Sequence, residues 1–174
     1  VIGDDPVMSE FTAPDGTRLH FCDEGDGPPI LCLAGLTRNG RDFDYVAPHL
    51  TGNRLIRLDY RGRGQSAWAD PASYSIPTEA ADALALLDHL NIAQTAILGT
   101  SRGGLIAMVI AATAKHRLSA VALNDIGPEL MADGLADIGT YLGRRPTART
   151  YAEAAHMRAT LMPGFDKVAQ SRWD

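Results

Sequence analysis

The feature that most constrains the fold of this chain is an alternation of short strand-like and helix-like runs over residues 1–127. The segment VMSEFTAPDGTRLHFCDEG predicts two antiparallel strands joined at residues 14–16, where Gly16 supplies the positive φ of a tight hairpin. Further strands are predicted at 28–35, 54–60, 94–101 and 118–125, with helices at 41–50, 77–92 and 102–117. Continuous apolar strands separated by helices are typical of a mostly parallel α/β sheet covered on both faces.

Residues 128–174 follow a different pattern, with helical stretches only. Apolar side chains recur at helical spacing in two groups: Leu135, Ile138 and Leu142, then Ala154, Met157, Leu161 and Met162. A helical lid over a binding site and ordinary core packing explain this pattern equally well. We therefore divide the chain into a core at 1–127 and the start of a helical cap at 128–174.

Composition excludes several classes of protein. The chain has 174 residues and a formal net charge of −5, which argues against nucleic acid or an anionic membrane as the main partner. No apolar run approaches the ~18 residues of a spanning helix, and the acidic start differs from a signal peptide, so we expect a cytoplasmic location. Cys22 and Cys32 form no CxxC motif and are expected to be reduced core thiols.

The run GTSRG at 99–103 fits the motif G-x-S-x-G, with a predicted strand before it and a helix after it. In such a turn the serine has strained dihedral angles, and Gly99 and Gly103 lack the Cβ atoms that would collide with neighbouring backbone. The helix N-terminus adds free N–H donors beside a developing oxyanion. Ser101 is therefore either a nucleophile or an ordinary helix cap.

Two further segments favour the nucleophile. The strand at 28–35 ends in AGLT (34–37), where Gly35 lets the backbone curl so that the next N–H can point at the serine. The strand at 54–60 leads into the glycine-spaced turn DYRGRGQS (59–66). Together, these three motifs are similar in order and spacing to those of the α/β-hydrolase superfamily over residues 7–127, and LNDIGP (123–128) resembles its passage from the sixth strand into the cap.

The resemblance implies an α/β-hydrolase fold with Ser101 as nucleophile and the backbone N–H groups of Leu36 and Arg102 as oxyanion hole. It implies no metal or organic cofactor. The expected reaction is hydrolysis, through an acyl-enzyme, of a small apolar or weakly polar ester, lactone or related carbonyl compound. Serine at the elbow disfavours the dehalogenases and epoxide hydrolases that use aspartate there. Ala34 replaces the histidine often found before that glycine.

A serine hydroxyl needs an imidazole base that is oriented by a carboxylate. Asp125, just past the sixth strand, occupies a position that some members of the superfamily use for the acid; more of them place it after the seventh strand, and Asp125 could instead cap the turn into the lid. No histidine follows a late strand, and we interpret all five as surface or structural residues, with His156 as the best exception: His20, His49, His89, His116 and His156.

By the same topology, the chain would stop inside the cap, before the last two strands and the catalytic histidine. The run at 118–123 would then be a sheet edge with unpaired N–H and C=O groups, which should be covered. We expect the 174 residues to be one segment of a longer or cleaved protein, or a second chain to supply the remaining strands.

Three alternatives compete with the hydrolase. A protein with this fold could bind a ligand without catalysis, as the missing base permits. The run at 62–67 also fits the dinucleotide fingerprint G-x-G-x-x-A, but two prolines follow where a helix should open, which argues against an oxidoreductase. A nucleic-acid contact at RGRG is disfavoured by the acidic balance.

Overall fold

The computed structural model describes residues 7–129, 136, 138–140, 142–144, 147–161 and 168. The chain divides into two compact units, Val1–Glu129 and Leu130–Asp174. The first unit contains the sheet, and the second contains helix α4 (Tyr151–Leu161). The role of the second unit as a lid stays a prediction. Leu135 and Met162 of its predicted apolar stripes lie outside the described residues.

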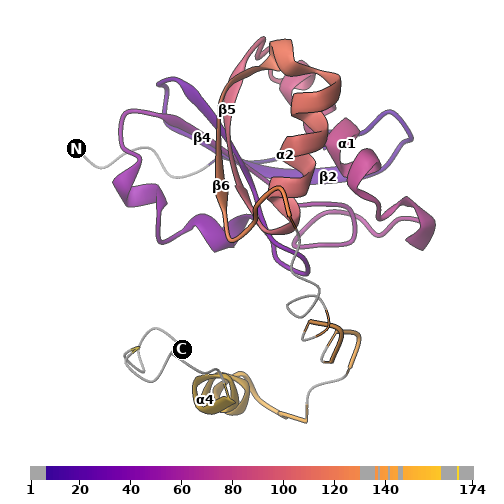
Figure 1. Cartoon of the computed structure of the whole chain (residues 1–174), viewed down its shortest axis with the longest axis vertical. Coiled ribbons are helices and arrows are strands. Elements are labelled where there is room, and N and C mark those ends of the chain that lie inside the picture. Colours follow the sequence, from indigo (N-terminus) through magenta and orange to yellow (C-terminus); the bar gives the residue numbers. More distant parts are fainter. Residues whose placement is uncertain are drawn as a thin grey trace. The chain divides into compact units, whose positions relative to one another are not determined.

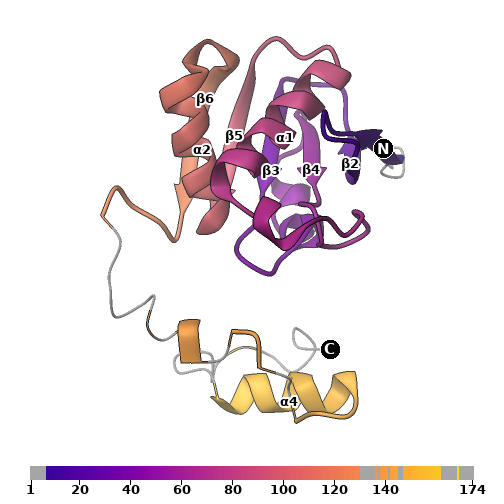
Figure 2. The same ribbon diagram turned by 90° about the vertical axis from the view of Figure 1, so that its right-hand side faces the viewer.

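The described strands form one six-stranded sheet in the order β1-β2-β4-β3-β5-β6, which confirms the predicted mixed α/β architecture (Figures 1 and 2). β4 runs antiparallel to β2 and parallel to β3, and the pairs β3–β5 and β5–β6 are also parallel. The strands are β1 (Val7–Thr12), β2 (Arg18–Glu24), β3 (Pro29–Leu33), β4 (Arg54–Leu58), β5 (Thr95–Thr100) and β6 (Leu118–Asn124).

The predicted hairpin at the start of the sheet is present. β1 pairs antiparallel with β2, with Thr12 opposite Arg18 and Val7 opposite Asp23. Gly16 has a φ of 87° in the connecting turn, and its N–H donates to the Ala13 carbonyl at 2.9 Å. A glycine reaches this left-handed region without steric cost, which is why the turn can be this short.

Helices α1 (Ile76–His89) and α2 (Arg102–Thr113) contact each other on one face of the sheet (Figure 1). α1 begins where the sequence predicts, with Pro77 in its first turn and the Ser75 hydroxyl accepting from the Thr78 N–H at 3.3 Å. The apolar face of α1 is buried against the core. α2 is hydrophobic on most sides because it lies between α1 and the strands β3, β5 and β6.

The helix predicted at 41–50 is wrong. Two single-turn 3-10 helices, η1 (Gly40–Phe43) and η2 (Ala47–His49), replace it and cover the opposite side of the sheet (Figure 1). Pro48 explains the break, because proline has no N–H and its ring would clash with the carbonyl of Asp44 in a continuous α-helix. Phe43 is nevertheless buried, as its helical spacing suggested. Two further 3-10 turns are η3 (Pro71–Ser73) and η4 (Lys115–Arg117).

β6 is the outer strand of the sheet. It runs parallel to β5 as predicted, but the expectation that both of its faces are covered is not met. Residues 119–124 are exposed, and Val121 and Leu123 are each 41% exposed. Because β6 ends the strand order, its second edge has no strand partner within the described part of the chain.

Both cysteines are free, as expected. They lie on β2 and β3, the two strands that flank β4, where Arg57 pairs with Cys22 across β2–β4 and with Cys32 across β3–β4. Burial raises the pKa of Cys32 to about 12 and also raises the pKa of Cys22, so neither is a reactive thiolate at neutral pH.

Among the described residues, none of the helices combines the length and apolar character needed to cross a membrane.

Candidate active site

Ser101 lies at the sharp turn between β5 and α2. Its dihedral angles are φ 49° and ψ −112°, a backbone conformation that a residue with a side chain rarely adopts. The surrounding backbone holds this turn: the Ser101 N–H donates to the Asn124 carbonyl at 2.9 Å, and the Ser101 carbonyl accepts from the Gly104 N–H at 2.9 Å. The strain is therefore imposed by β6 on one side and α2 on the other.

The serine hydroxyl does not cap the helix. Ser101 is the N-cap residue of α2, yet its side chain makes no capping hydrogen bond. An ordinary serine cap adopts extended dihedrals and accepts from a backbone N–H two or three residues later, as Ser75 does at α1. The helix-cap alternative is thus wrong for Ser101, and its half-buried hydroxyl is not used in stabilising the helix.

The glycines on either side of Ser101 are required by close backbone contacts, as the sequence predicts. A Cβ on Gly99 would lie 2.7 Å from the Gly103 carbonyl oxygen. A Cβ on Gly103 would collide with the carbonyl oxygen of Leu33 at the end of β3. The first turn of α2 can therefore approach both strands only with hydrogen at these two positions.

The turn that follows β3 lies against the serine. A Cβ built on Gly35 would be 3.8 Å from the Ser101 Cβ, which is ordinary contact distance. The turn is closed by the Arg38 N–H, which donates to the Gly35 carbonyl at 3.1 Å, and Thr37 has a φ of 68°. Leu36 is thus carried to the same end of the sheet as the first residue of α2.

Leu36 and Arg102 border a common hollow of about 70 Å³. Within the described residues, the backbone N–H of neither one donates to a protein acceptor. Buried and half-buried amides are nearly always paired, so two free donors beside a strained serine fit an acceptor supplied by a ligand. The other residues that line the hollow are Thr37, Tyr60, Arg63, Tyr74 and Glu79.

Several polar contacts fix the wall of this hollow. The Arg102 guanidinium donates to the buried Glu79 carboxylate at 2.7 Å and to the Tyr74 carbonyl at 3.2 Å. The Tyr60 hydroxyl donates to the Ala34 carbonyl at 3.0 Å, and burial raises the pKa of Tyr60 well above its usual value. Tyr60 therefore holds the end of β3 at the position where the sequence lacks the often-found histidine.

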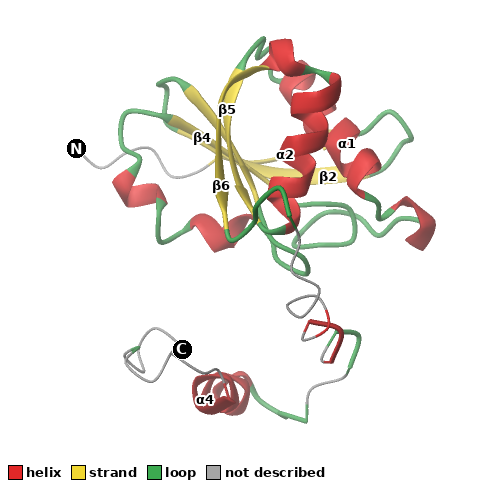
Figure 3. Cartoon of the chain, viewed as in Figure 1, coloured by secondary structure: helices red, strands yellow, loops and turns green. Residues whose placement is uncertain are grey.

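The motif DYRGRGQS carries Tyr60 and is built around the buried Asp59. The Asp59 carboxylate accepts from the backbone N–H groups of Gly40 at 2.8 Å and Gln65 at 2.9 Å, and contacts His20 Nδ1 at 3.0 Å. Ser66 Oγ donates to the Asp59 carbonyl at 2.6 Å. His20 is thus structural, as predicted. The motif is a loop without a helix at its glycines (Figure 3), which argues against the dinucleotide fingerprint.

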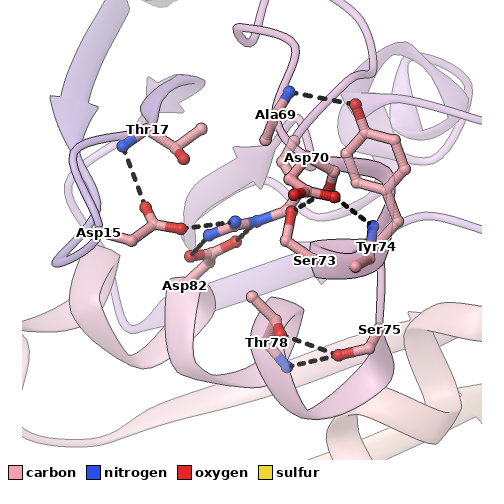
Figure 4. A network of polar contacts seen from close by, with 11 residues as sticks. Asp15, Thr17, Ala69, Asp70, Ser73, Tyr74, Ser75, Thr78 and Asp82 are labelled. Atoms are coloured by element: carbon pink, nitrogen blue, oxygen red, sulfur yellow. Dashed lines mark hydrogen bonds and ion pairs between the residues drawn. The ribbon is translucent and has the colours of Figure 1, made fainter.

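Arg61 in the same motif forms a cluster that sequence reasoning missed. Its side chain is 1% exposed and donates twice to the buried Asp82 of α1, at 2.8 and 2.7 Å, and once to Asp15 of the β1–β2 turn, at 2.7 Å (Figure 4). This pairing lowers the pKa of Asp15 to about 2 and raises that of Arg61. The sequence shows that residues 15, 61 and 82 are charged, but they are too far apart along the chain for any local pattern to predict that they form ion pairs.

The loop between β4 and α1 is also held by its own hydrogen bonds (Figure 4). The Ala69 N–H donates to the Tyr74 hydroxyl at 3.1 Å, and the Ser73 hydroxyl donates to the Asp70 carbonyl at 2.6 Å. Tyr74 is therefore fixed in place as one wall of the hollow. The sequence identified neither Tyr74 nor Glu79 as a site residue.

Asp125 directly follows the residue that binds the Ser101 backbone, Asn124. It is exposed and has a φ of 53°, so the chain turns sharply there. Its role as the catalytic acid stays a prediction. Of the four histidines in residues 7–129, none is hydrogen-bonded to Ser101; His89, for example, packs its ring 5.6 Å from that of Phe11.

A mixed sheet in the order β1-β2-β4-β3-β5-β6, with a strained strand-to-helix turn directly after β5, is the arrangement of the α/β-hydrolase class. A family model for the alpha/beta hydrolase fold matches residues 28–156, and the chain belongs to this family.

Among its relatives, the 3-hydroxybutyrate-oligomer hydrolase of Cupriavidus necator is 37% identical over 161 residues, which cover 90% of this chain and 55% of that protein. A solved alpha/beta hydrolase from Novosphingobium aromaticivorans is 38% identical with a TM-score of 0.90, covering 97% of this chain and 61% of that one. An esterase from Exiguobacterium antarcticum is 32% identical with a TM-score of 0.63, and the match covers 67% of this chain and 44% of that one. The chain thus spans 44–61% of the length of these proteins.

Proposed function

We propose that the protein containing this chain is a serine hydrolase that cleaves small esters through an acyl-enzyme on Ser101. The observation that carries the proposal is the backbone at Ser101, which is strained, leaves the hydroxyl out of helix capping, and lies beside two unpaired amides. Strain of this kind costs about 1–3 kcal/mol and is retained where it serves a function.

In this mechanism the Ser101 oxygen attacks the ester carbonyl carbon and passes its proton to an imidazole base. The oxygen anion of the tetrahedral intermediate accepts hydrogen bonds from the N–H groups of Leu36 and Arg102. The C–O bond then breaks, and the alcohol leaves with the proton. Water attacks the acyl-enzyme with the help of the same base, which releases the acid and restores Ser101.

The base is proposed to lie outside residues 7–129, since no histidine in that range is hydrogen-bonded to Ser101. Asp125 remains the candidate acid within the chain because it directly follows Asn124 at the elbow. We also propose that the second edge of β6 is covered by a further strand of the same protein or by a second chain.

For the substrate, the names of two relatives point to esters: one is a hydrolase of 3-hydroxybutyrate oligomers and another is an esterase. We propose a short ester, with 3-hydroxybutyrate oligomers as the first compounds to test. Chromatographic detection of released 3-hydroxybutyrate measures this directly.

Covalent labelling of the full-length protein with a fluorophosphonate tests the catalytic role of Ser101. We expect one adduct, located at Ser101 by peptide mass spectrometry and absent from the Ser101→Ala variant. Ser119→Ala, which removes an exposed serine on β6, serves as the matched control and should label like the wild type. Absence of any adduct on folded protein would favour the alternative, a ligand-binding protein without catalysis.

A further inference from the structure

One cation beside the candidate active site has no carboxylate partner. Arg63 borders the same hollow as Leu36 and Arg102, and its side chain forms no ion pair with any described residue. Every other arginine in residues 7–129 pairs with a carboxylate: Arg18, Arg38, Arg41, Arg54, Arg57, Arg61, Arg102 and Arg117. Arg63 is thus the exception at the one place where a ligand is expected.

The position of Arg63 is fixed by the loop that carries it. One Nη donates to the carbonyl of Gly62 at 2.8 Å, and the guanidinium lies 5.8 Å from the centre of the Tyr74 ring. Both contacts leave the other N–H groups of the guanidinium without acceptors among the described residues. Tyr74 is itself held through the Ala69 N–H, so the cation is presented on a rigid aromatic wall.

The charges around the hollow leave a net positive site. Arg102 is neutralised by the buried Glu79, with 2.7 Å between Nε and Oε2. Arg63 supplies the remaining charge, and the unpaired amides of Leu36 and Arg102 add positive partial charge nearby. A guanidinium with free donors in a half-buried position is a binding group for a carboxylate, which matches its planar geometry.

We infer that Arg63 binds a free carboxylate of the substrate and makes this hydrolase selective for esters that carry one. The inference rests on the proposed function and narrows its substrate class. It replaces the expectation of a small apolar or weakly polar substrate with that of an ester that carries a carboxylate. Arg63 would thereby determine specificity, whereas Ser101 and the two amides would carry out the reaction.

The test compares two pairs of activated esters in the full-length protein. In the first pair the charge lies on the acyl side: 4-nitrophenyl hydrogen adipate and its methyl ester. In the second it lies on the leaving group: 3-acetoxybenzoate and its methyl ester. For at least one pair we expect the ratio of kcat/KM values, charged over neutral ester, to fall about 10- to 100-fold in Arg63→Gln. The ratio isolates recognition of the charge, because an effect of the substitution that is common to both esters of a pair cancels in it.

Matched variants separate charge from folding. Arg41→Gln removes an arginine that is 89% exposed and should leave both ratios unchanged. Arg63→Lys keeps the charge and should retain part of the preference. In the wild type, added salt should lower the ratio for the same pair, an effect that Arg63→Gln abolishes.

Unchanged ratios for both pairs in Arg63→Gln would overturn the role of Arg63. Fluorophosphonate labelling of Ser101 in the same samples distinguishes that result from a failure of the proposed function. An Arg63→Gln protein that labels normally but keeps its anion preference refutes only the specificity role, whereas a wild type that does not label refutes both.

Discussion

The turn at Ser101 and the cluster around Arg61 belong to the same unit of the chain but differ in how well their polar groups are satisfied. Arg61 is buried and donates to two carboxylates at 2.7–2.8 Å. Ser101 has a backbone in a disfavoured conformation and a hydroxyl that does not cap its helix. Buried polar groups whose hydrogen bonds are all made stabilise the fold. Polar groups that lack hydrogen-bond partners on a strained backbone are available for ligand binding and chemistry.

The largest effect that tests this contrast is expected at Ser101. Ser101→Gly removes the nucleophile and relieves the positive φ, because glycine adopts φ 49° at little cost. We expect hydrolysis to fall by about 10⁴-fold or more. The free energy of unfolding should rise, because about 1–3 kcal/mol of relieved strain exceeds the roughly 0.5–1 kcal/mol that glycine costs by loosening the unfolded chain. Ester hydrolysis and urea denaturation measure the two quantities. A destabilised Ser101→Gly variant would show that the turn is not strained.

The next largest effect is expected at the Arg61 cluster. Asp82→Ala leaves a buried guanidinium without its bidentate partner, which should lower the free energy of unfolding by about 3–5 kcal/mol. Asp88→Ala on the same helix is the matched control: its carboxylate pairs with Arg117 but is 68% exposed, so its loss should cost at most about 1 kcal/mol. Equal losses in the two variants would contradict the structural role assigned to Arg61.

The smallest effect concerns pH. Arg61 lowers the pKa of Asp15 from 3.8 to about 2 in the folded state, so the pair contributes full stability above pH 4 and loses it as the pH falls toward 2. The Asp15 side chain is 49% exposed, and solvent screening reduces the contribution to about 1 kcal/mol. Urea denaturation should show Asp15→Asn less stable than wild type at pH 7, with a difference that shrinks as the pH falls from about 4 through 2, since Asp15 becomes protonated in the folded state over that range. A difference of constant size over that range would assign the effect to packing.

Much of the fold could be predicted because the signals are local. The hairpin depends on Gly16, the start of α1 on Ser75 and Pro77, and the elbow in part on Gly99, which lies against the backbone of Gly103 only four residues later. The helix predicted at 41–50 failed because apolar spacing was given more weight than Pro48, which prevents a continuous helix there. The outer edge of β6 was predicted from topology, but the exposure of residues 119–124 was not, because the apolar composition of the strand predicts covered faces.

The sequence by itself determined that a serine flanked by glycines links a strand to a helix, since the motif and the periodicity on each side of it are local. It also determined the order of the six strands and of helices α1 and α2 along the chain. Only the tertiary structure decided that Tyr60 holds Ala34, that Arg61 joins Asp15 to Asp82, and that Arg63 stands unpaired beside the hollow. These partners lie 21 to 46 residues apart in the ion pairs and bonds concerned. No local pattern predicts these contacts, because they depend on how the whole sheet brings distant loops to the same end of its strands.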